Sequence, residues 1–414
     1  MIYRKNQSEV RESDSSVANF SRTQKNIYLD YAAATPVDEK VLAVMLPYFR
    51  ENFYNPSAAY LSAKSVREDL ENARHSVAQI LGSRPAEIVF TAGATESINL
   101  AFNFPRTTKR AKILISAVEH ESVLSAAARD TIFTKVQLIK VDKFGRVDLD
   151  DLRAKINDDT AMISIGYANN EIGTVQPIRE IAEIVKKVRE DRTDRGIKNH
   201  ILFHIDASQA AGYLDLNVAR LGIDLMTLNA AKCYGPKQVG LLYVRAGVKL
   251  NPLFAGGGQE MNLRSGTENV AGAIGFAKAL GLAEKHRAAE TKRLKLLRDD
   301  LEGFITKEFP NVQINGSQKA RLPNLLNFSL PNLDGERAVF ALDQRGIQVA
   351  TGSACAANKG TRSHVLAAIG LPPKIADGSL RISLGRPTTR EEIERAKPIL
   401  LDVLREQLKF GSQK

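Results

Sequence analysis

Short apolar runs alternate with segments of helical period along most of the chain. In the segment 62–81 apolar residues recur three or four positions apart and Gly82 follows, which predicts an amphipathic helix that ends at the glycine. Helical segments such as 178–189 separate most of the strand-like runs that come next. These runs are 87–91, 112–116, 136–141, 161–165, 201–205, 224–228 and 241–244. Strands that alternate with helices favour βαβ crossovers and a mainly parallel, seven-stranded sheet between helices.

The pattern changes after residue 266. Two helical stretches, 269–285 and 287–309, lead into a smaller unit that ends in an amphipathic helix from 390 to about 410. In that unit strand-like runs at 324–330, 347–350 and 380–384 accompany a helix at 336–344. We therefore expect an α/β protein with a large domain over 38–287. A smaller α+β C-terminal domain is expected from 27–37 and 288–414.

The first 26 residues are polar and lack the apolar core of a secretory signal, and we expect them to form a disordered extension. Nowhere does an apolar run approach the roughly 18 residues that cross a bilayer, so no membrane association is expected. Only two cysteines occur, Cys233 and Cys355. Their number excludes a disulfide framework and favours a reducing compartment, for which we take the cytoplasm.

The formal net charge is +11, and it has two interpretations. It could attract an acidic protein or RNA over long range, or it could reflect scattered, solvated Lys and Arg. Because no basic stretch carries the interleaved aromatics of a nucleic-acid motif, direct nucleic-acid binding is not expected.

Candidate chemistry follows five of the strand-like runs. In an open parallel sheet, functional groups collect beyond the carboxyl ends of the strands. The runs are followed by Ala92-Gly93-Ala94-Thr95-Glu96, Ala117-Val118-Glu119-His120, Ala168-Asn169-Asn170-Glu171, Asp206-Ala207-Ser208-Gln209 and Asn229-Ala230-Ala231-Lys232. One crevice is thus predicted to hold a Gly-Ala-Thr turn, a His, an Asn, an Asp, a Gln and a Lys.

Three of these groups suggest a cofactor with an aldehyde, a phosphate and a cationic ring. Small residues before Thr95 let a helix N-terminus approach an anion, although Thr95 alone could be an ordinary N-cap. A desolvated Lys232 loses proton affinity and can condense with an aldehyde, although a lysine there could also be a solvated loop residue. A buried Asp206 needs a cationic partner such as a protonated pyridine nitrogen, unless backbone N–H groups satisfy it.

Together these stretches resemble the NifS/IscS-type cysteine desulfurases. These belong to the class V aminotransferase group of the fold-type I pyridoxal-phosphate (PLP) enzymes. The similarity extends from about Ile27 to the C-terminus in consistent order. Besides the five stretches above, it rests on Leu29-Asp30-Tyr31-Ala32-Ala33-Ala34-Thr35-Pro36, Lys232-Cys233-Tyr234-Gly235-Pro236-Lys237, Arg264-Ser265-Gly266-Thr267, Gly352-Ser353-Ala354-Cys355 and Arg381-Ile382-Ser383-Leu384-Gly385-Arg386.

The resemblance implies a role for each candidate residue. Lys232 carries PLP, Asp206 pairs with its pyridine nitrogen, Gln209 approaches its phenolic oxygen, and His120 stacks on the ring and moves protons. The implied cofactor-binding residues are Ala94, Thr95, His120, Asn170, Asp206, Gln209, Asn229, Lys232 and Thr267, of which Thr267 acts across a homodimer. The implied substrate-binding residues are Asn55, Asn170 and Arg381, and no metal ligands are implied.

Taken singly, several of these residues have an ordinary structural interpretation. Arg381 could form a surface ion pair, Asn170 could be a turn residue, and His120 could be a satisfied histidine at a helix start. Their joint occurrence in family order favours the functional interpretation.

Cys355 decides the expected reaction. It lies among small residues flanked by glycines, a segment that packs poorly and can swing as a carrier does, whereas a structural cysteine is usually buried among larger apolar side chains. With Lys232, Cys355 and His120 as catalytic residues, the resemblance implies a PLP-dependent cysteine desulfurase. It would convert L-cysteine to L-alanine and pass a persulfide from Cys355 to an acceptor protein of iron–sulfur cluster assembly or tRNA thiolation.

Two other functions stay open at this point, and the chain departs from the family pattern. A selenocysteine or cysteine-sulfinate lyase is one alternative, and a desulfurase-like, non-enzymatic partner subunit is the other. The family usually has Ser-x-His-Lys where this chain reads Asn229-Ala230-Ala231-Lys232. Since Ala231 offers no hydrogen bond to a phosphate, we expect looser PLP retention. Cys233 beside Lys232 is expected to be a packing residue, with a second sulfur-transfer thiol as the alternative.

Overall fold

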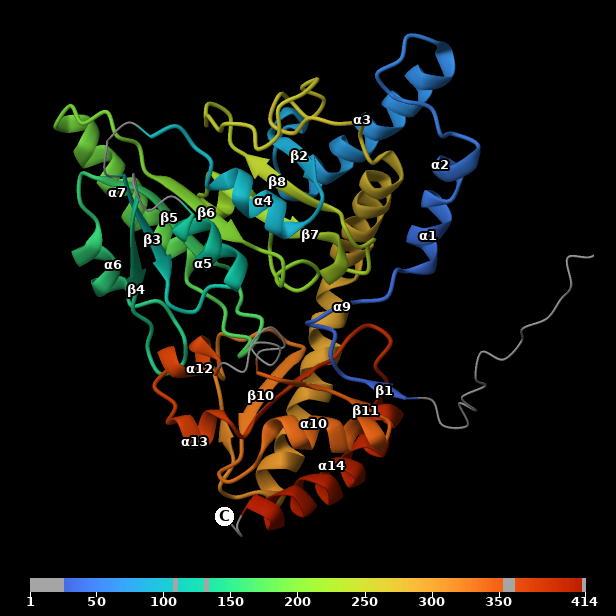
Figure 1. Cartoon of the computed structure of the whole chain (residues 1–414), viewed down its shortest axis with the longest axis vertical. Coiled ribbons are helices and arrows are strands. Elements are labelled where there is room, and N and C mark those ends of the chain that lie inside the picture. The colour runs from blue at the N-terminus through green and yellow to red at the C-terminus, as the bar shows by residue number, and fades with distance from the viewer. Residues whose placement is uncertain (1–25, 107–110, 130–133, 353–361, 412–414) are drawn as a thin grey trace, which may run out of the picture.

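The computed structural model describes residues 26–106, 111–129, 134–352 and 362–411. The expected N-terminal extension up to residue 25 and the expected sulfur carrier Cys355 lie outside these residues. Figure 1 shows two units, one above the other, with helix α9 running from the upper unit into the lower one.

A seven-stranded sheet forms the centre of the upper unit. Its order is β2-β8-β7-β6-β5-β3-β4; β8 is antiparallel to both of its neighbours, and the strands from β7 to β4 are mutually parallel. The strands are β2 (Ile88–Thr91), β3 (Ala111–Ser116), β4 (Thr134–Ile139), β5 (Thr160–Gly166), β6 (Leu202–Asp206), β7 (Leu225–Asn229) and β8 (Gly240–Val244). All seven predicted strands and the mainly parallel α/β sheet are confirmed.

Helices cover both faces of this sheet (Figure 1). Along β3, Ile113 and Ile115 pack into the core beneath α4 and α5, while Leu114 between them packs into the core beneath α3, α7 and α9, because successive strand residues point to opposite faces. The helices of this unit are α1 (Glu39–Met45), α2 (Pro47–Arg50), α3 (Leu61–Leu81), α4 (Ala94–Ala101), α5 (Glu121–Ala128), α6 (Leu149–Lys155), α7 (Ile178–Asp194) and α8 (Val218–Leu221).

The predicted end of α3 is confirmed. Gly82 adopts the left-handed conformation, with φ of 65°, and its N–H donates to Ala78 O in the last turn. Glycine reaches this conformation without steric cost, which is why it terminates helices so often.

The lower unit has its own sheet and its own core. The antiparallel order is β12-β13-β10-β9, and β1 pairs in parallel with β11. The predicted strand 347–350 is divided between β11 and β12. The elements are β1 (Ile27–Tyr28), β9 (Gln313–Ile314), β10 (Leu325–Ser329), α10 (Gly335–Gln344), β11 (Ile347–Gln348), β12 (Ala350–Thr351), α12 (His364–Ala368), α13 (Pro373–Ala376), β13 (Ser379–Ser383) and α14 (Arg390–Gly411).

Helix α9 (Val270–Glu308) corrects the expectation of two helical stretches. The sequence from 282 to 302 contains no glycine or proline, so one continuous helix forms. Its first half contributes Phe276 to the core of the upper unit, and its second half contributes Leu294 and Leu301 to the core of the lower unit. The proposed domain boundary at 287/288 falls between these two halves. Within the described residues, no helix is both long and apolar enough to span a bilayer.

Candidate active site

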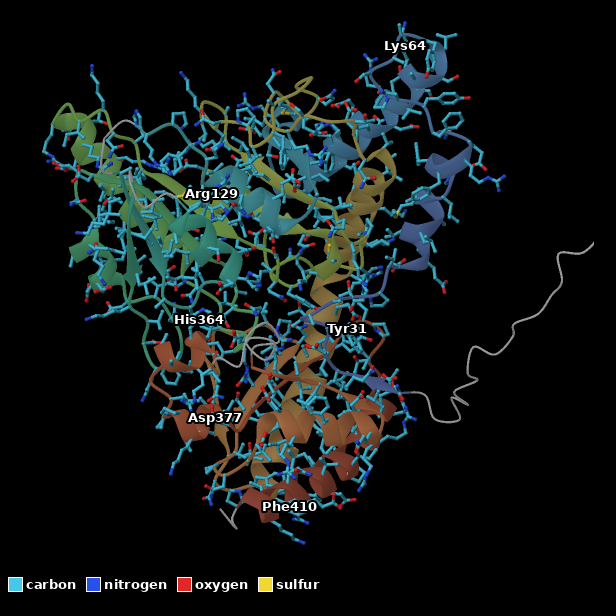
Figure 2. The ribbon with its side chains drawn as sticks, in the orientation of Figure 1. Tyr31, Lys64, Arg129, His364, Asp377 and Phe410 are labelled. Carbon is cyan, nitrogen blue, oxygen red and sulfur yellow. The ribbon has the colours of Figure 1, made fainter. Side chains whose placement is uncertain are left out.

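A cavity of about 610 Å³ lies at the carboxyl ends of the sheet strands and extends to side chains of the lower unit. His364, which lines it, lies at the junction of the two units (Figure 2). The structure brings nine of the predicted site residues to this cavity: Ala94, Thr95, His120, Asn170, Asp206, Gln209, Asn229, Lys232 and Arg381.

Lys232 lies in a short 3-10 turn that follows β7. Its Nζ donates to Ala32 O at 2.9 Å and to Ala33 O at 2.7 Å, and Gln209 Nε2 donates to Ala32 O at 3.0 Å. The segment that follows β1 therefore forms one wall of the cavity. A primary amine with two carbonyl acceptors is held at the cavity surface, where it can meet an aldehyde.

Asp206 ends β6 and faces the cavity, half-buried. Its Oδ1 accepts from Ser208 N at 2.9 Å, so the backbone satisfies part of the carboxylate. Within the part of the chain that the structure describes, no Lys or Arg forms an ion pair with it. A carboxylate in this position fits a cationic ring nitrogen.

His120 is the N-cap of α5. The alternative that it is a satisfied histidine at a helix start is therefore right as far as helix capping is concerned. Its Nδ1 accepts from Ser122 N at 3.1 Å, which leaves Nε2 to carry the hydrogen in the neutral ring. The ring is open to the cavity, but protein surrounds its other sides. That desolvation lowers the pKa of His120, while Asp206 opposes the shift and Lys232 reinforces it. A neutral imidazole in this tautomer can donate its Nε2 proton and take it back.

Arg381 is buried, with its side chain 3% exposed, so the alternative of a surface ion pair is wrong. Its Nη2 donates to Asp30 Oδ1 at 2.7 Å and its Nη1 donates to Asn170 O at 2.9 Å. Among the described residues, Nε has no hydrogen-bond acceptor. A buried guanidinium donor without an acceptor costs free energy, and a carboxylate in the cavity would relieve that cost.

The end of the cavity near β2 offers backbone donors. Gly93, with φ of 132°, precedes α4, and the unpaired N–H groups of the first turn include those of Ala94 and Thr95. Gly93 is the N-cap, so Thr95 is not the ordinary N-cap that it could have been. Asn229 Oδ1 accepts from Ala231 N at 3.1 Å, which leaves its Nδ2 as a donor. This set fits a phosphate.

Two predicted residues are not brought to the cavity of their own chain. Asn55 is exposed, and its side chain accepts from Ser57 N within its own turn. That turn precedes α3, whose first turn at Lys64 lies far from His364 (Figure 2). Thr267 is exposed on a loop outside the cavity, and its role toward a partner subunit stays a prediction. Cys355 lies outside the described residues.

The lining residues that were not assigned a role from the sequence include Glu119, Glu171, Ser208 and His364. Glu119, Glu171 and Ser208 stand inside the stretches that carry the family resemblance, so that position was the available signal. His364 had no comparable signal, because its proximity depends on how the lower unit meets the upper one.

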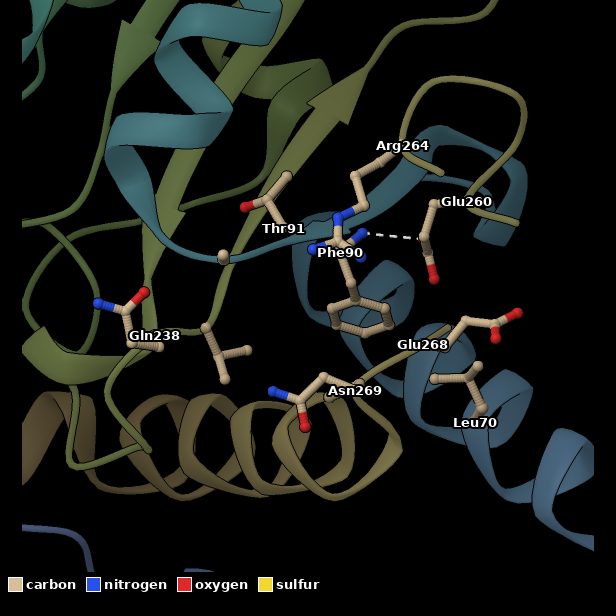
Figure 3. Close-up of a pocket in the computed structure, with 11 residues that line it drawn as sticks. Leu70, Phe90, Thr91, Gln238, Glu260, Arg264, Glu268 and Asn269 are labelled. Atoms are coloured by element: carbon tan, nitrogen blue, oxygen red, sulfur yellow. Dashed lines mark hydrogen bonds between the residues drawn. The ribbon is translucent and has the colours of Figure 1, made fainter. Parts of the chain in front are cut away.

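A second cavity, of about 60 Å³, lies beneath the loop that leads to Thr267 (Figure 3). Glu260 lines it and forms a buried ion pair with Arg74, at 2.7 Å. Arg264 lines it as well and pairs with Glu96 of α4 at 3.2 Å. These two ion pairs hold the loop against α3 and against α4, the helix whose N-terminus lies at the phosphate-binding end of the large cavity.

Comparison with known proteins agrees with this geometry. The family model "Aminotransferase class-V" matches residues 27–396. The chain belongs to this family. A cysteine desulfurase IscS from Dictyoglomus turgidum is 42% identical over 381 residues, which cover 91% of this chain and 94% of the relative. PLP is the cofactor of the class-V aminotransferases, and the cavity residues described above fit its aldehyde, ring nitrogen and phosphate.

Solved structures of class-V relatives have the same fold. A "NifS-like protein" has a TM-score of 0.83 and 35% identity, and the match covers 92% of this chain and all of that one. A structure titled "SspA in complex with cysteine" has a TM-score of 0.74 and 34% identity, with 86% of this chain and 98% of that one covered. The predicted fold-type I architecture is thereby confirmed.

Proposed function

We propose that this chain is a PLP-dependent cysteine desulfurase that takes sulfur from L-cysteine, releases L-alanine and passes the sulfur on from Cys355. The observation that carries the proposal is Arg381 Nε, a buried donor without an acceptor among the described residues, in the same cavity as the Lys232 amine. An α-amino acid offers a carboxylate to the first group and an amine near the second. The relative named a cysteine desulfurase and the neighbour solved with cysteine support cysteine as that amino acid.

Different residues of the cavity act on the substrate and on the cofactor. When bound, PLP withdraws electrons from Cα of an amino acid and so labilises its bonds. Arg381 and Asn170 hold the carboxylate, and Asp206 keeps the ring nitrogen protonated. Lys232 Nζ takes the Cα proton, and His120 Nε2 supplies or receives a proton on the sulfur side. Ala94, Thr95 and Asn229 hold the phosphate, and Gln209 lies beside the phenolic oxygen.

Sulfur transfer is assigned to Cys355. Its thiolate attacks the sulfur of the substrate, an S–S bond forms, and the C–S bond breaks. The electron pair of the C–S bond stays on the carbon fragment, which leaves as alanine after Cβ takes up a proton and Lys232 returns the proton to Cα. Cys233 is excluded from this role, because burial raises the pKa of its thiol to about 12 and it is only 1% exposed.

A homodimer is part of the proposal. Large apolar side chains lie exposed along the segment that runs from α1 through α2 to the start of α3. They are Leu42, Leu46, Phe49, Phe53, Tyr60 and Leu61, between 46% and 82% exposed. Contiguous exposed apolar surface of this kind marks an interface, and a second copy would also receive Thr267. The acceptor is proposed to be an iron–sulfur scaffold or a tRNA-thiolation protein, in the cytoplasm.

The test is a single-turnover reaction of the PLP-loaded protein with L-cysteine. Alanine is quantified, and the Cys355 peptide is weighed under non-reducing conditions. We expect alanine and one added sulfur atom on that peptide, loss of both in Lys232→Ala, and retention of both in the matched cysteine control Cys233→Ala. Absence of alanine would overturn the proposal, and sulfide release that survives Cys355→Ser would favour a lyase.

A further inference from the structure

Glu119 is a buried carboxyl group at the floor of the cavity, with one oxygen bonded and the other not. The residue is 2% exposed, and Oε1 accepts from Gly166 N at 2.7 Å. Oε2 is buried, and among the described residues no group lies within hydrogen-bond distance of it. An ionised carboxylate with a single hydrogen bond and no cationic partner is costly in such a place.

The charges around Glu119 add to this cost. Burial is the main cause that raises its pKa to about 8; the hydrogen bond from Gly166 opposes the shift, and the negative charge of Asp206 on β6 reinforces it. From α12, His364 Nε2 donates to the backbone carbonyl of Glu119 at 2.8 Å, not to its carboxyl. At neutral pH the carboxyl therefore keeps its proton on Oε2, since Oε1 accepts from an N–H.

The position of Glu119 joins two parts of the site. It precedes His120 in the chain, and its bond partner Gly166 is the residue paired with Asp206 across β5 and β6. Tyr167 N, one residue further along, donates to Asp206 O at 2.8 Å. A Cβ at Gly166 would lie 3.5 Å from Glu119 Oε2, an ordinary van der Waals contact, so the carboxyl lies directly beside this glycine.

We propose that Glu119 is a positioning residue that works as a neutral acid, holding the His120 turn against the β5–β6 pair and keeping a second negative charge away from Asp206. A carboxylate in its place adds negative charge beside Asp206, favours a protonated His120 and repels anions that enter the cavity. The inference deepens the proposed function and rests on it for the identity of those anions. The protonation of Glu119 itself is measurable without them.

The first test uses the cofactor-free protein and its histidine ring signals. The chain has six histidines, and the variants His120→Gln and His364→Gln identify two of the ring C–H resonances in a pH series from 6 to 10. We expect the His120 signal to show an inflection near pH 8 in addition to its own titration. Glu119→Gln copies the neutral acid and should lose this inflection, while the exposed Glu183→Gln on α7 should keep it. A wild-type His120 signal without an inflection near pH 8 overturns the inference, whether or not any variant folds, and so does an unchanged inflection in Glu119→Gln.

The second test measures PLP affinity by absorbance at pH 7 and pH 9. The wild-type dissociation constant should rise with pH more steeply than that of Glu119→Gln, and Glu119→Ala should lose affinity already at pH 7, since it has no acceptor for Gly166 N. A residue that merely filled space would leave the pH profile the same in wild type and Glu119→Gln, which would refute the positioning role. Neither readout requires desulfurase activity, so failure of the proposed function and failure of this inference are distinguishable.

Discussion

The buried ion pair between Arg74 of α3 and Glu260 allows a stability prediction with a worked magnitude. The two side chains are each 4% exposed and join through two hydrogen bonds, of 2.7 and 2.8 Å. Arg74 also donates to Ile88 O at 2.8 Å. Replacing Arg74 with methionine keeps much of the volume but leaves the Glu260 carboxylate buried without its cation. Removal of one partner from such a pair costs about 3–5 kcal/mol.

The double variant separates the ion pair from packing. Glu260→Gln together with Arg74→Met leaves no buried charge, and Phe90 N can still donate to the side-chain oxygen at position 260, as it now does at 3.0 Å. Because replacing both partners avoids the cost of an uncompensated charge, we expect the double variant to lose only about 1–2 kcal/mol. Figure 3 shows Phe90, Glu260 and Arg264 around the small cavity that Glu260 lines.

Urea unfolding followed by circular dichroism measures both costs, with the slope held common to all variants. Arg84→Met is a matched control, since Arg84 is 67% exposed and its 3.3 Å pair with Glu87 should contribute less than about 1 kcal/mol. The reasoning is refuted if Arg74→Met stays within about 1 kcal/mol of wild type, or if the double variant is as unstable as the single one.

Two further predictions concern pH and the cofactor. Burial raises the pKa of Glu171 to about 7 from an ordinary 4.5, although the hydroxyl of Ser363 donates to it at 2.5 Å. The stability that its proton provides is therefore complete below pH 4.5 and lost as the pH rises through 7. At about 1.4 kcal/mol per pKa unit, Glu171→Gln should remove roughly 3 kcal/mol of this pH dependence. Equal changes in unfolding free energy between pH 5 and 8 in both proteins would contradict it. Ala231→His should lower the PLP dissociation constant about tenfold, because it adds one donor to a charged phosphate. The control variant Ala246→His, at an exposed position, should leave the constant unchanged. An unchanged constant in titrations of Ala231→His would show that Ala231 does not loosen PLP retention.

The strands and most of the cavity were predictable, because periodicity reports which residues face a core and parallel strands end at one edge. That reasoning placed His120, Asp206 and Lys232 in one cavity from three separate strands. It divided α9 into two helices near residue 286, although no glycine or proline stands there to stop a helix. It also did not predict the bond from Lys232 to Ala32, which joins residues 200 positions apart.

The protonation of the site depends on contacts of the same long-range kind. Glu119 and Glu171 are ordinary acids in the sequence, and burial is the main cause that raises their pKa values to about 8 and about 7. If both were ionised, the lining of the cavity would hold four carboxylates, those of Glu119, Glu121, Glu171 and Asp206. With Glu119 and Glu171 protonated, the lining carries two fewer negative charges. The proposed ligands bring a phosphate and a carboxylate into this space, and protonation of the two buried acids reduces the repulsion that these anions meet.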